Sequence, residues 1–364
     1  MNRTDSKSDA PIMMLSAGNG FIMQSEKYSR DNAGQSLKKC ILLKQGELAY
    51  NHGASKAKQY GCCYELTEPE ARIPYVYHCF KVSETEHTPF VASTLNNPKM
   101  DKQLKRLVSS SVRMDGLLNI SFDDYMSVSL HLPSLAEQKK IADFLKMIDE
   151  RISVQEELVA ALKKYKRGLL MHYFSENNTK QWTNYSISQI GKVITGNTPP
   201  TNDRSNYDGD LLFCSPGDVG EKKYISSTEK RVSAKGFSLG RPLPPNSIIV
   251  TCIGLIGKLG IATADMITNQ QINALVVTKD FDHEFIYYAF EKFFPEYRSK
   301  VSMQTLPILS KSEFEKLMIK VPQIDDQLKI RNHLSAVDRR IEHSQQELNI
   351  LRDQRKGLTQ QLFI

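Results

Sequence analysis

Two stretches of the chain place apolar residues at alternating steps of four and three, the spacing of a long amphipathic helix. The first runs from Ile141 to Tyr173 and the second from Ile330 to Leu362. A heptad seam of this length, with charged residues elsewhere, is typical of a coiled coil. The seam positions expected to pack in a helix pair are Ile141, Leu145, Ile148, Ile152, Val159, Leu162, Ile330, Leu334, Val337, Ile341, Leu348, Leu351 and Leu358.

The two stretches are copies of one 43-residue repeat whose members stand 189 positions apart. The copies are Leu132–Phe174 and Val321–Phe363, and twelve of their positions are identical. Each copy opens with a proline, Pro133 or Pro322, which fits a strand or loop that ends just before a helix begins. The repeat therefore predicts a chain built as unit, helix, unit and helix, with two similar ends.

The same two seam positions are polar in both copies. They hold Gln155 and Ser344 at one position, and Lys166 and Arg355 at the other. If the two helices pair antiparallel, each polar residue faces an aliphatic residue of the other helix, and the pairing obeys a pseudo-twofold axis. Polar seam residues commonly fix register and orientation. The seam thus favours a mutual antiparallel pair, and the alternative is two separate helices, each docked on its own globular domain.

The remaining segments predict two α+β units. The expected division is residues 1–131 for the first unit, 132–177 for the central helix, 178–320 for the second unit and 321–364 for the distal helix. In the second unit, Ser247–Asp265 predicts two apolar strands joined by a glycine-rich turn. The segment His283–Val301 predicts a helix that ends near Pro295.

The first unit follows a comparable order. Leu37–Gly53 takes the place of the strand pair, and Pro89–Val108 takes the place of the helix. Leu118–Pro133 then lines up with Pro307–Pro322, directly before each long helix. We infer two versions of one fold with divergent surfaces, which suggests two different ligands of one class.

Composition adds little to this picture. The net charge of +7 is spread evenly over the four segments, so any basic surface must arise from folding. The six cysteines form no CxxC pair, the eight histidines are scattered, and no apolar run approaches membrane-spanning length. No charged-then-apolar leader opens the chain. A reduced cytoplasmic protein without a structural metal is expected.

Fragments that resemble catalytic motifs lack the neighbours that catalysis needs. Gly254–Lys258 lacks the spacer and the hydroxyl residue of a phosphate-binding loop, so a hairpin turn with glycines at positive φ is expected. Asn197–Pro200 lacks the aromatic residue of a methyltransferase loop and predicts a turn. Cys62 and Cys63 have no indicated histidine partner and predict buried structure. No catalytic residue is therefore assigned.

Basic residues in the two units are candidate nucleic-acid contacts. Phosphates are bound by Lys and Arg, and base edges in the major groove are read by Arg, Lys, Asn and Gln. The alternative for each residue is an ordinary solvated surface charge. The candidates are Lys56, Lys58, Lys102, Lys105, Arg113, Lys222, Lys223, Arg241 and Lys258.

At the repeated helices the sequence resembles a known family. LPSLAEQKKIADFLKMIDERI (132–152) and VPQIDDQLKIRNHLSAVDRRI (321–341) are similar to the two conserved regions of the specificity subunit of type I restriction–modification enzymes. The second unit adds Trp182 at its start, ISQIGKVITGNTPPTNDRSNYDGD (187–210), SIIVTCIGLIGKLGI (247–261) and TNQQINAL (268–275). The resemblance covers nearly the whole chain.

The resemblance implies a function in DNA recognition. Each unit would be a target-recognition domain that reads one half of a bipartite sequence in double-stranded DNA, and the helix pair would set their spacing. Two modification subunits would supply S-adenosylmethionine and adenine methylation, and two restriction subunits would supply ATP- and Mg-dependent translocation and cleavage. This chain would hold no cofactor and would contact no membrane.

One departure from the family concerns the front of the first unit. The second unit has about 30 residues between Trp182 and LLFCSPGD, whereas only Met1–Ile12 precede the comparable MMLSAGNG of the first unit. Some 20 expected residues are missing, with their tryptophan, so a weakened first half-site is expected. The alternative function is a truncated or silent allele that acts only as a protein-assembly scaffold. A self-contained methyltransferase is disfavoured because no methyl-donor motif is present.

Overall fold

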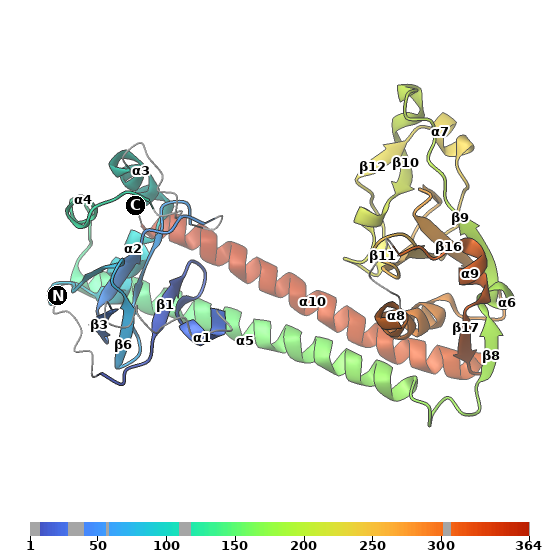
Figure 1. Ribbon diagram of the computed structural model, residues 1–364, viewed down its shortest axis with the longest axis horizontal. Coiled ribbons are helices and arrows are strands. Elements are labelled where there is room, and N and C mark those ends of the chain that lie inside the picture. Colours follow the sequence, from blue (N-terminus) through green and yellow to red (C-terminus); the bar gives the residue numbers. More distant parts are fainter. Residues whose placement is uncertain (1–7, 28–39, 56–57, 109–117, 301–306, 364) are drawn as a thin grey trace. The chain divides into compact units, whose positions relative to one another are not determined.

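The computed structural model describes residues 8–27, 40–55, 58–108, 118–300 and 307–363. The chain divides into two compact units. Unit 1 comprises residues 1–156 and 346–364, and unit 2 comprises residues 157–345. Two long helices contribute to both units, α5 (Leu135–Tyr173) and α10 (Ile324–Leu362), and each is continuous (Figure 1). The repeated sequence thus folds as two helices of equal length.

Unit 2 is an α+β unit built on a five-stranded sheet of order β11-β14-β13-β16-β9 and a three-stranded sheet of order β12-β10-β15. Its strands are β8 (Thr183–Ser186), β9 (Gly191–Thr195), β10 (Tyr207–Cys214), β11 (Tyr224–Ile225), β12 (Lys230–Val232), β13 (Ile248–Thr251), β14 (Leu259–Ala262), β15 (Met266–Thr268), β16 (Ile272–Val277) and β17 (Met318–Val321). Its helices are α6 (Ile187–Ile190), α7 (Ala234–Leu239), α8 (His283–Lys300) and α9 (Lys311–Lys316), with 3-10 turns η2 (Arg204–Asn206) and η3 (Pro216–Asp218). The ends of the two long helices complete the unit.

The predicted strand pair of unit 2 is present. β13 pairs antiparallel with β14, and the turn between them holds Gly254 and Gly257 at φ of 74° and 78°. A Cβ on Gly257 would come within 2.4 Å of the Phe294 ring, so this position requires glycine for space as well as for conformation. The lysine-containing turn therefore serves the packing of the sheet against α8.

The predicted end of the helix near Pro295 is wrong, because α8 continues through Pro295 to Lys300. Residues on both sides of the proline are held by the core, since Phe294 is fully buried and its ring contacts that of Tyr297. Arg298 also donates to the carbonyl oxygen of Ile256 at 2.8 Å. These tertiary contacts outweigh the one helical hydrogen bond that a proline removes.

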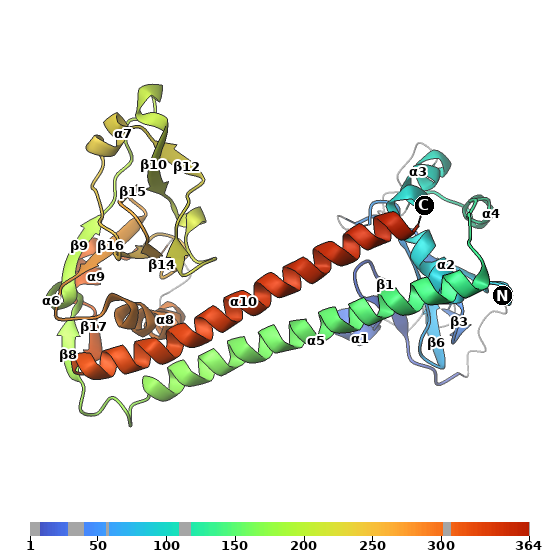
Figure 2. The ribbon, with the colours of Figure 1, turned by 180° about the vertical axis from the view of Figure 1, so that it is seen from behind.

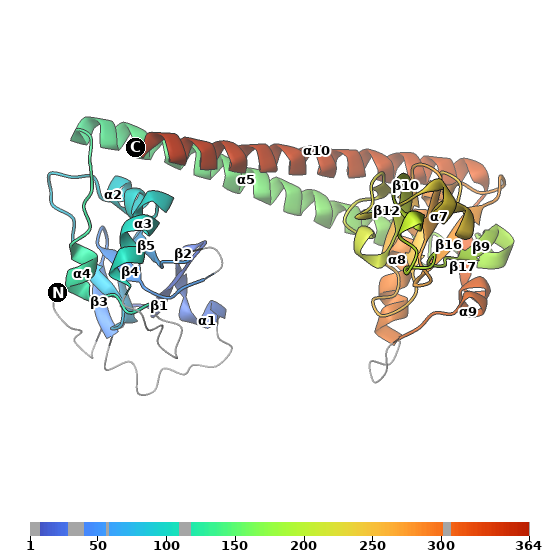
Figure 3. The same cartoon turned by 90° about the horizontal axis from the view of Figure 1, so that it is seen from above.

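Unit 1 carries a smaller set of short strands in three groups, β1-β2, β3-β6 and β5-β4-β7. The strands are β1 (Met13–Ser16), β2 (Gly20–Met23), β3 (Cys40–Lys44), β4 (Leu48–Asn51), β5 (Cys62–Glu65), β6 (Glu70–Pro74) and β7 (His78–Phe80). The helices are α1 (Gln24–Lys27), α2 (Thr88–Leu95), α3 (Pro98–Leu107) and α4 (Phe122–Met126). Figure 3 shows α2 beside β5, with which it is in contact.

Two expectations for unit 1 need correction. The segment 37–53 does not form a strand pair, because β3 pairs with β6 and β4 pairs with β5 and β7. The segment 89–108 is two helices and not one. α2 ends at Leu95, with Asn96 as its C-cap. The side chain of Asn97 accepts from the backbone N–H of Lys99 and so caps α3, while Pro98 occupies the first turn of that helix.

Each unit is joined to the start of a long helix by the same buried glutamine. In unit 1, Gln138 donates to the carbonyl of Pro133 at 2.9 Å and accepts from the backbone N–H of His87 at 3.0 Å. In unit 2, Gln327 donates to Pro322 at 2.9 Å and accepts from the N–H of Asp282 at 2.9 Å. His87 and Asp282 stand directly before α2 and α8. The repeated glutamine therefore connects the turn before a long helix to the first turn of its neighbour.

The elements around that joint also correspond. Phe90 of α2 contacts Phe363 with ring centroids 5.1 Å apart, and Phe285 of α8 contacts Phe174 at 5.6 Å. Short helices α4 and α9 precede the long helices and begin with capping boxes at Ser121–Asp124 and Ser310–Glu313. The predicted alignment of 118–133 with 307–322 is thus found at these short helices, whereas residues 129–132 form no strand where unit 2 has β17. Figure 2 shows β17 and β8 beside the start of α10.

The helix seam contains charge pairs that the heptad pattern did not indicate. In unit 1, Arg355 of α10 contacts both carboxylate oxygens of Asp149 in α5, at 2.9 and 3.1 Å. In unit 2, Lys166 of α5 lies 2.7 Å from Asp338 of α10. These two pairs are related by the 189-residue repeat. The polar seam residues therefore reach an aspartate one position beyond the aliphatic residue that they were expected to face.

We expect Gln327→Met to lower the free energy of unfolding by about 2–4 kcal/mol, because it leaves the Asp282 N–H and the Pro322 carbonyl without their partner. Denaturant unfolding followed by the fluorescence of Trp182 measures this loss. The matched control is Gln323→Met in the exposed turn before α10, for which we expect a change within about 0.5 kcal/mol. An equal loss in both variants would contradict the assigned joint.

Candidate nucleic-acid interface

Three loops of unit 2 bring amide, hydroxyl and guanidinium groups together at the end of β9. Arg241 donates to the carbonyl of Thr195 at 2.8 Å, and Asn197 donates to the carbonyl of Leu239 at 2.8 Å. Thr198 donates to the side chain of Gln270 at 2.6 Å. Thr198, Arg241 and Gln270 are exposed. We call these four side chains, Asn197, Thr198, Arg241 and Gln270, the amide–arginine cluster.

The chemistry of this cluster suits base edges and phosphates. Arg, Asn and Gln form the paired hydrogen bonds that distinguish guanine and adenine in the major groove, and Thr and Arg also bind phosphate. The cluster is positioned by the sheet, since β9 ends at Thr195 and α7 ends at Leu239. Loops on a rigid scaffold are where binding residues concentrate.

Of the residues predicted from sequence in unit 2, Lys222 and Arg241 are exposed and Lys258 is half-buried. Lys223 is different, because its side chain is only 11% exposed. Its Nζ lies 2.7 Å from Glu284 and donates to the hydroxyl of Tyr288 at 2.8 Å. The prediction that Lys223 contacts DNA is therefore wrong. A lysine with these partners holds loop 220–223 against α8.

Lys223 belongs to a buried polar network that joins α5, α8 and α10 in unit 2. The carboxylate of Glu284 accepts from Lys223, from Ser335 at 2.6 Å and from Tyr224 at 2.6 Å. Tyr288 donates to Asp338 at 2.5 Å. The second carboxylate on α8, Glu291, lies 2.8 Å from Lys166, which also reaches Asp338. We call these eight residues, Lys166, Lys223, Tyr224, Glu284, Tyr288, Glu291, Ser335 and Asp338, the helix-anchoring network.

The network changes the ionisation of its members. Burial acts to raise the pKa of Glu284, but hydrogen bonds from Lys223, Ser335 and Tyr224 lower that pKa to about 2. Burial raises the pKa of Glu291 despite the nearby Lys166. Burial alone would lower the pKa of Lys166, yet the charges of Glu291 and Asp338 outweigh it and raise the pKa. Buried charges of this kind require partners to remain ionised.

In unit 1 the candidates gather on α3. Lys102 and Lys105 are exposed there, beside the exposed Lys99 and Arg106, while Met100 and Leu104 turn inward. Lys58 is half-buried, its Nζ donates to the carbonyl of Asn96 at 2.7 Å, and burial lowers its pKa. The structure therefore assigns Lys58 a structural contact at the end of α2. Lys56 and Arg113 lie outside the described residues.

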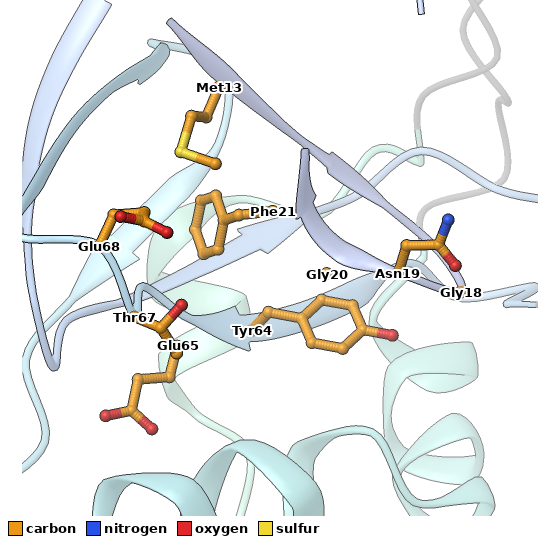
Figure 4. A pocket seen from close by; sticks show the side chains of 9 residues that line it. All are labelled: Met13, Gly18, Asn19, Gly20, Phe21, Tyr64, Glu65, Thr67 and Glu68. Atoms are coloured by element: carbon orange, nitrogen blue, oxygen red, sulfur yellow. The ribbon is translucent and has the colours of Figure 1, made fainter. Parts of the chain in front are cut away.

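A pocket of about 320 Å³ in unit 1 is a poor place for a phosphate. Figure 4 shows it between the β1–β2 hairpin and Tyr64–Glu68, with Phe21 and Tyr64 as its aromatic walls. Its charged lining residues are Glu65 and Glu68, which repel anions. Burial raises the pKa of Glu65. We therefore do not place a nucleic-acid contact in this pocket.

Other kinds of site receive no support in the described parts of the chain. Burial raises the pKa of Cys62 to about 11 and of Cys63 to about 12, the opposite of what a nucleophile needs. Among the residues that the structure describes, no three His, Cys, Asp or Glu side chains are grouped so that they could hold a metal ion. None of the helices described is long and apolar enough to cross a membrane.

The sequence indicated Arg241 but did not single out its neighbours. Asn197 and Thr198 lie in a predicted turn, and Gln270 lies in the motif TNQQINAL. The sequence signal is the presence of two polar motifs in one unit, one at Asn197–Pro200 and one at TNQQINAL. The contact between Thr198 and Gln270, which are 72 residues apart, appears only in the fold.

Comparisons with known proteins address the same unit. Residues 179–352 match the family model of the type I restriction modification DNA specificity domain. This part of the chain is therefore similar to that domain. The match confirms the resemblance to specificity subunits seen in the sequence. The matched residues include β8–β17 and most of α10.

Two curated proteins similar to this chain are specificity subunits of type I restriction enzymes. The chain is 32% identical over 179 residues to the type I restriction enzyme MjaIX specificity subunit of Methanocaldococcus jannaschii, covering 47% of this chain and 41% of that protein. It is 29% identical over 108 residues to the HindI specificity subunit of Haemophilus influenzae, covering 29% and 24%. The chain therefore spans less than half the length of either relative.

Two solved structures have a similar fold over nearly the full length of this chain. One comes from a study of complex assembly and conformational transition of the type I R-M system, with a TM-score of 0.59, 12% identity, and coverage of 97% of this chain and 91% of that one. The other is the S subunit of the type I system from M. genitalium, with a TM-score of 0.58, 14% identity, and coverage of 98% and 89%. At these identities the comparison concerns fold alone.

The pKa of Glu284 predicts how the helix-anchoring network responds to acid. A lowered pKa stabilises the folded state above the unfolded value of about 4.3, and this contribution is lost as the pH falls towards 2. We expect the stability difference between wild type and Glu284→Gln to be large at about pH 6 and smaller at about pH 3.5. Urea unfolding at both pH values measures it.

The control for this measurement is Glu296→Gln on the same helix, because the Glu296 side chain is 63% exposed. A surface pair of this kind contributes little, so its stability difference should be small at both pH values. A stability difference for Glu284→Gln that did not depend on pH would show that the carboxylate charge is not what the network stabilises.

Proposed function

We propose that this protein is the DNA sequence-specificity subunit of a type I restriction–modification complex, that it reads a bipartite target, and that it has no catalytic site of its own. The observation that carries this proposal is the match of residues 179–352 to the DNA specificity domain. The curated relatives and the fold agree with it. The S-adenosylmethionine, ATP and Mg would then be bound by partner subunits.

We further propose that the two units are similar target-recognition domains related by a pseudo-twofold axis, with α5 and α10 as an antiparallel coiled coil. The glutamine joints, the phenylalanine contacts and the Arg355–Asp149 and Lys166–Asp338 pairs support this symmetry, since each contact in one unit has a counterpart 189 residues away or nearly so. In each unit the start of one long helix contacts the end of the other.

The second half-site would be read by the amide–arginine cluster together with Lys222 and Lys258. The first would be contacted by α3 through Lys102 and Lys105. The exposed basic residues supply phosphate contacts whose number sets the salt dependence of binding, while the amides and Arg241 supply base contacts.

We expect the modification complex assembled with this subunit to place methyladenine in a two-part motif with an unspecific spacer, detected by modified-base sequencing of DNA from cells with and without this gene. Arg241→Ala should weaken specific DNA binding about tenfold or more and relax one position of the second half-motif. Lys316→Ala on α9 is the control, since this exposed residue lies outside the cluster.

Two outcomes would count against this proposal. If methylation does not depend on the gene, although the partner is expressed and bound, the truncated-allele scaffold becomes the better explanation. If Arg241→Ala and Lys316→Ala weaken binding equally, the cluster is not the reading surface.

The docking of modification subunits is proposed to use an exposed face of α5. In unit 1 it carries Phe144, Met147 and Val154, which are 42%, 60% and 66% exposed, and in unit 2 it continues with Leu158 and Tyr165 at 38% and 52%. These positions recur at helical spacing on one side of α5. Apolar stripes of this kind mark protein interfaces.

We expect Val154→Lys to reduce co-purification of the modification subunit about tenfold or more, because a charge would be buried in the interface. Ser153→Lys is a matched control, since it adds the same charge at the next residue on a different side of the helix. Unchanged denaturant midpoints would show that both variants are folded. Equal recovery from both pull-downs would exclude this face as the docking surface.

A further inference from the structure

In unit 2 the segment that follows α5 closes the end of the domain with a tryptophan and a strand. The ring of Trp182 contacts Phe174 and Phe285, with centroids 5.7 and 5.8 Å apart. The next residues form β8, which pairs antiparallel with β17 so that Thr183 lies opposite Val321. Three aromatic rings and one strand pair thus seal the joint between the long helices and the unit.

The edge of β17 that receives β8 can be assigned residue by residue. Ile187 donates its N–H to the carbonyl of Leu317 at 3.0 Å. Because hydrogen-bonded pairs alternate along an antiparallel ladder, Ile319 and Val321 also turn their backbone groups toward β8. Both side chains are buried, at 6% and 1% exposure.

Unit 1 has the same walls. The rings of Phe90 and Phe363 are in contact as Phe285 and Phe174 are, and residues 129–132 occupy the repeat positions of β17. Leu130 and Leu132 correspond to Ile319 and Val321, yet they are only half-buried. Across the residues that the structure describes, no strand pairs with residues 129–132.

A cavity of about 480 Å³ lies at this place in unit 1. Its apolar lining includes Phe90, Leu130, Leu132, Ile141, Leu362 and Phe363. These are the two counterparts of the rings that hold Trp182, the two counterparts of the β17 edge, and residues of the long helices. The cavity therefore corresponds to the space that Trp182 and β8 fill in unit 2.

The segment that carries the open edge is held in place by a side chain of α3. The side chain of Gln103 accepts from the N–H of Ser129 at 3.1 Å and donates to the Ser129 carbonyl at 3.0 Å. Gln103 and Ser129 also line the cavity. In an extended chain the backbone groups of Leu130 and Leu132 turn to the edge opposite that of Ser129. Gln103 thus bonds to the backbone of Ser129 as a neighbouring strand would, and it makes no such bond to Leu130 or Leu132. An open edge of this kind accepts an added strand, and adjacent pockets select its side chains.

We propose that this cavity and the edge at Leu130–Leu132 form an acceptor groove for an extended segment of another polypeptide, in which a tryptophan precedes a short strand as in Trp182–Ser186. The tryptophan ring packs against Phe90 and Phe363, and the strand pairs with residues 130–132. This assignment follows from the internal repeat and does not depend on the proposed DNA recognition.

The test uses the full chain and a fluorescein-labelled peptide with the sequence of residues 178–190. We expect saturable binding by fluorescence anisotropy, and at least about tenfold weaker binding of the same peptide with Trp182→Ala, because the aromatic contact is lost. Hydrogen exchange should slow at residues 130–132 when the peptide is bound. Leu130→Pro, which removes one edge N–H, should weaken binding about tenfold, and Leu130→Val should not.

The location of protection separates the groove from a rival site. Slower exchange confined to unit 1, with discrimination between the two peptides, supports the acceptor groove. Three results overturn it: no saturable binding at roughly millimolar peptide, equal affinity for both peptides, or altered exchange at residues 318–321, where the peptide would be displacing β8 from unit 2. Circular dichroism of Leu130→Pro and Leu130→Val checks that a loss of binding is not a loss of fold.

Discussion

A single buried glutamine in each half of the chain holds together the long helix that carries it, the turn before that helix and the start of a neighbouring helix. Gln138 and Gln327 each donate to a proline carbonyl in the turn before a long helix. Each also accepts from the backbone N–H of the residue directly before the neighbouring helix. An amide can do this because it donates and accepts at once. Leaving either backbone group buried without a partner costs more than the bond itself contributes. The phenylalanine contacts of α2 and α8 then involve the same helices whose starts this joint fixes.

The two halves then diverge in how they hold the helices. Unit 1 uses a bidentate pair between Arg355 and Asp149 in which both side chains are partly exposed, at 35% and 50%. Unit 2 uses the equivalent Lys166 and Asp338, at 14% and 21% exposure, and adds carboxylates from α8. A partly exposed pair is screened by solvent, whereas a buried pair must be fully satisfied or it destabilises the fold. The same repeat position thus carries different energetic weight in the two units.

Much of this architecture could be predicted from the sequence, and the reasons for the failures are physical. The long helices and the alignment of the segments before them follow from a strong repeat and a regular heptad pattern. The end of α8 could not be predicted, because the packing of Phe294 and Arg298 overrides the local effect of Pro295. Lys223 could not be recognised as buried, since its partner Glu284 is 61 residues away. The amide–arginine cluster likewise depends on contacts between loops that no local pattern records.

The helix-anchoring network also bears on how such a chain can change over evolutionary time. Lys166 and Asp338 lie on the long helices, while Lys223, Glu284 and Glu291 lie in the globular part of unit 2. A recombination event that replaced only the globular part would have to bring compatible carboxylates with it, or leave Lys166 without the contact that Glu291 provides. Loops of unit 2 that carry no member of the network, such as the one at Asn197 and Thr198, are free of this requirement. Exchange of such loops is therefore less constrained than exchange of α8, which is linked to the sequence of the helices that it contacts.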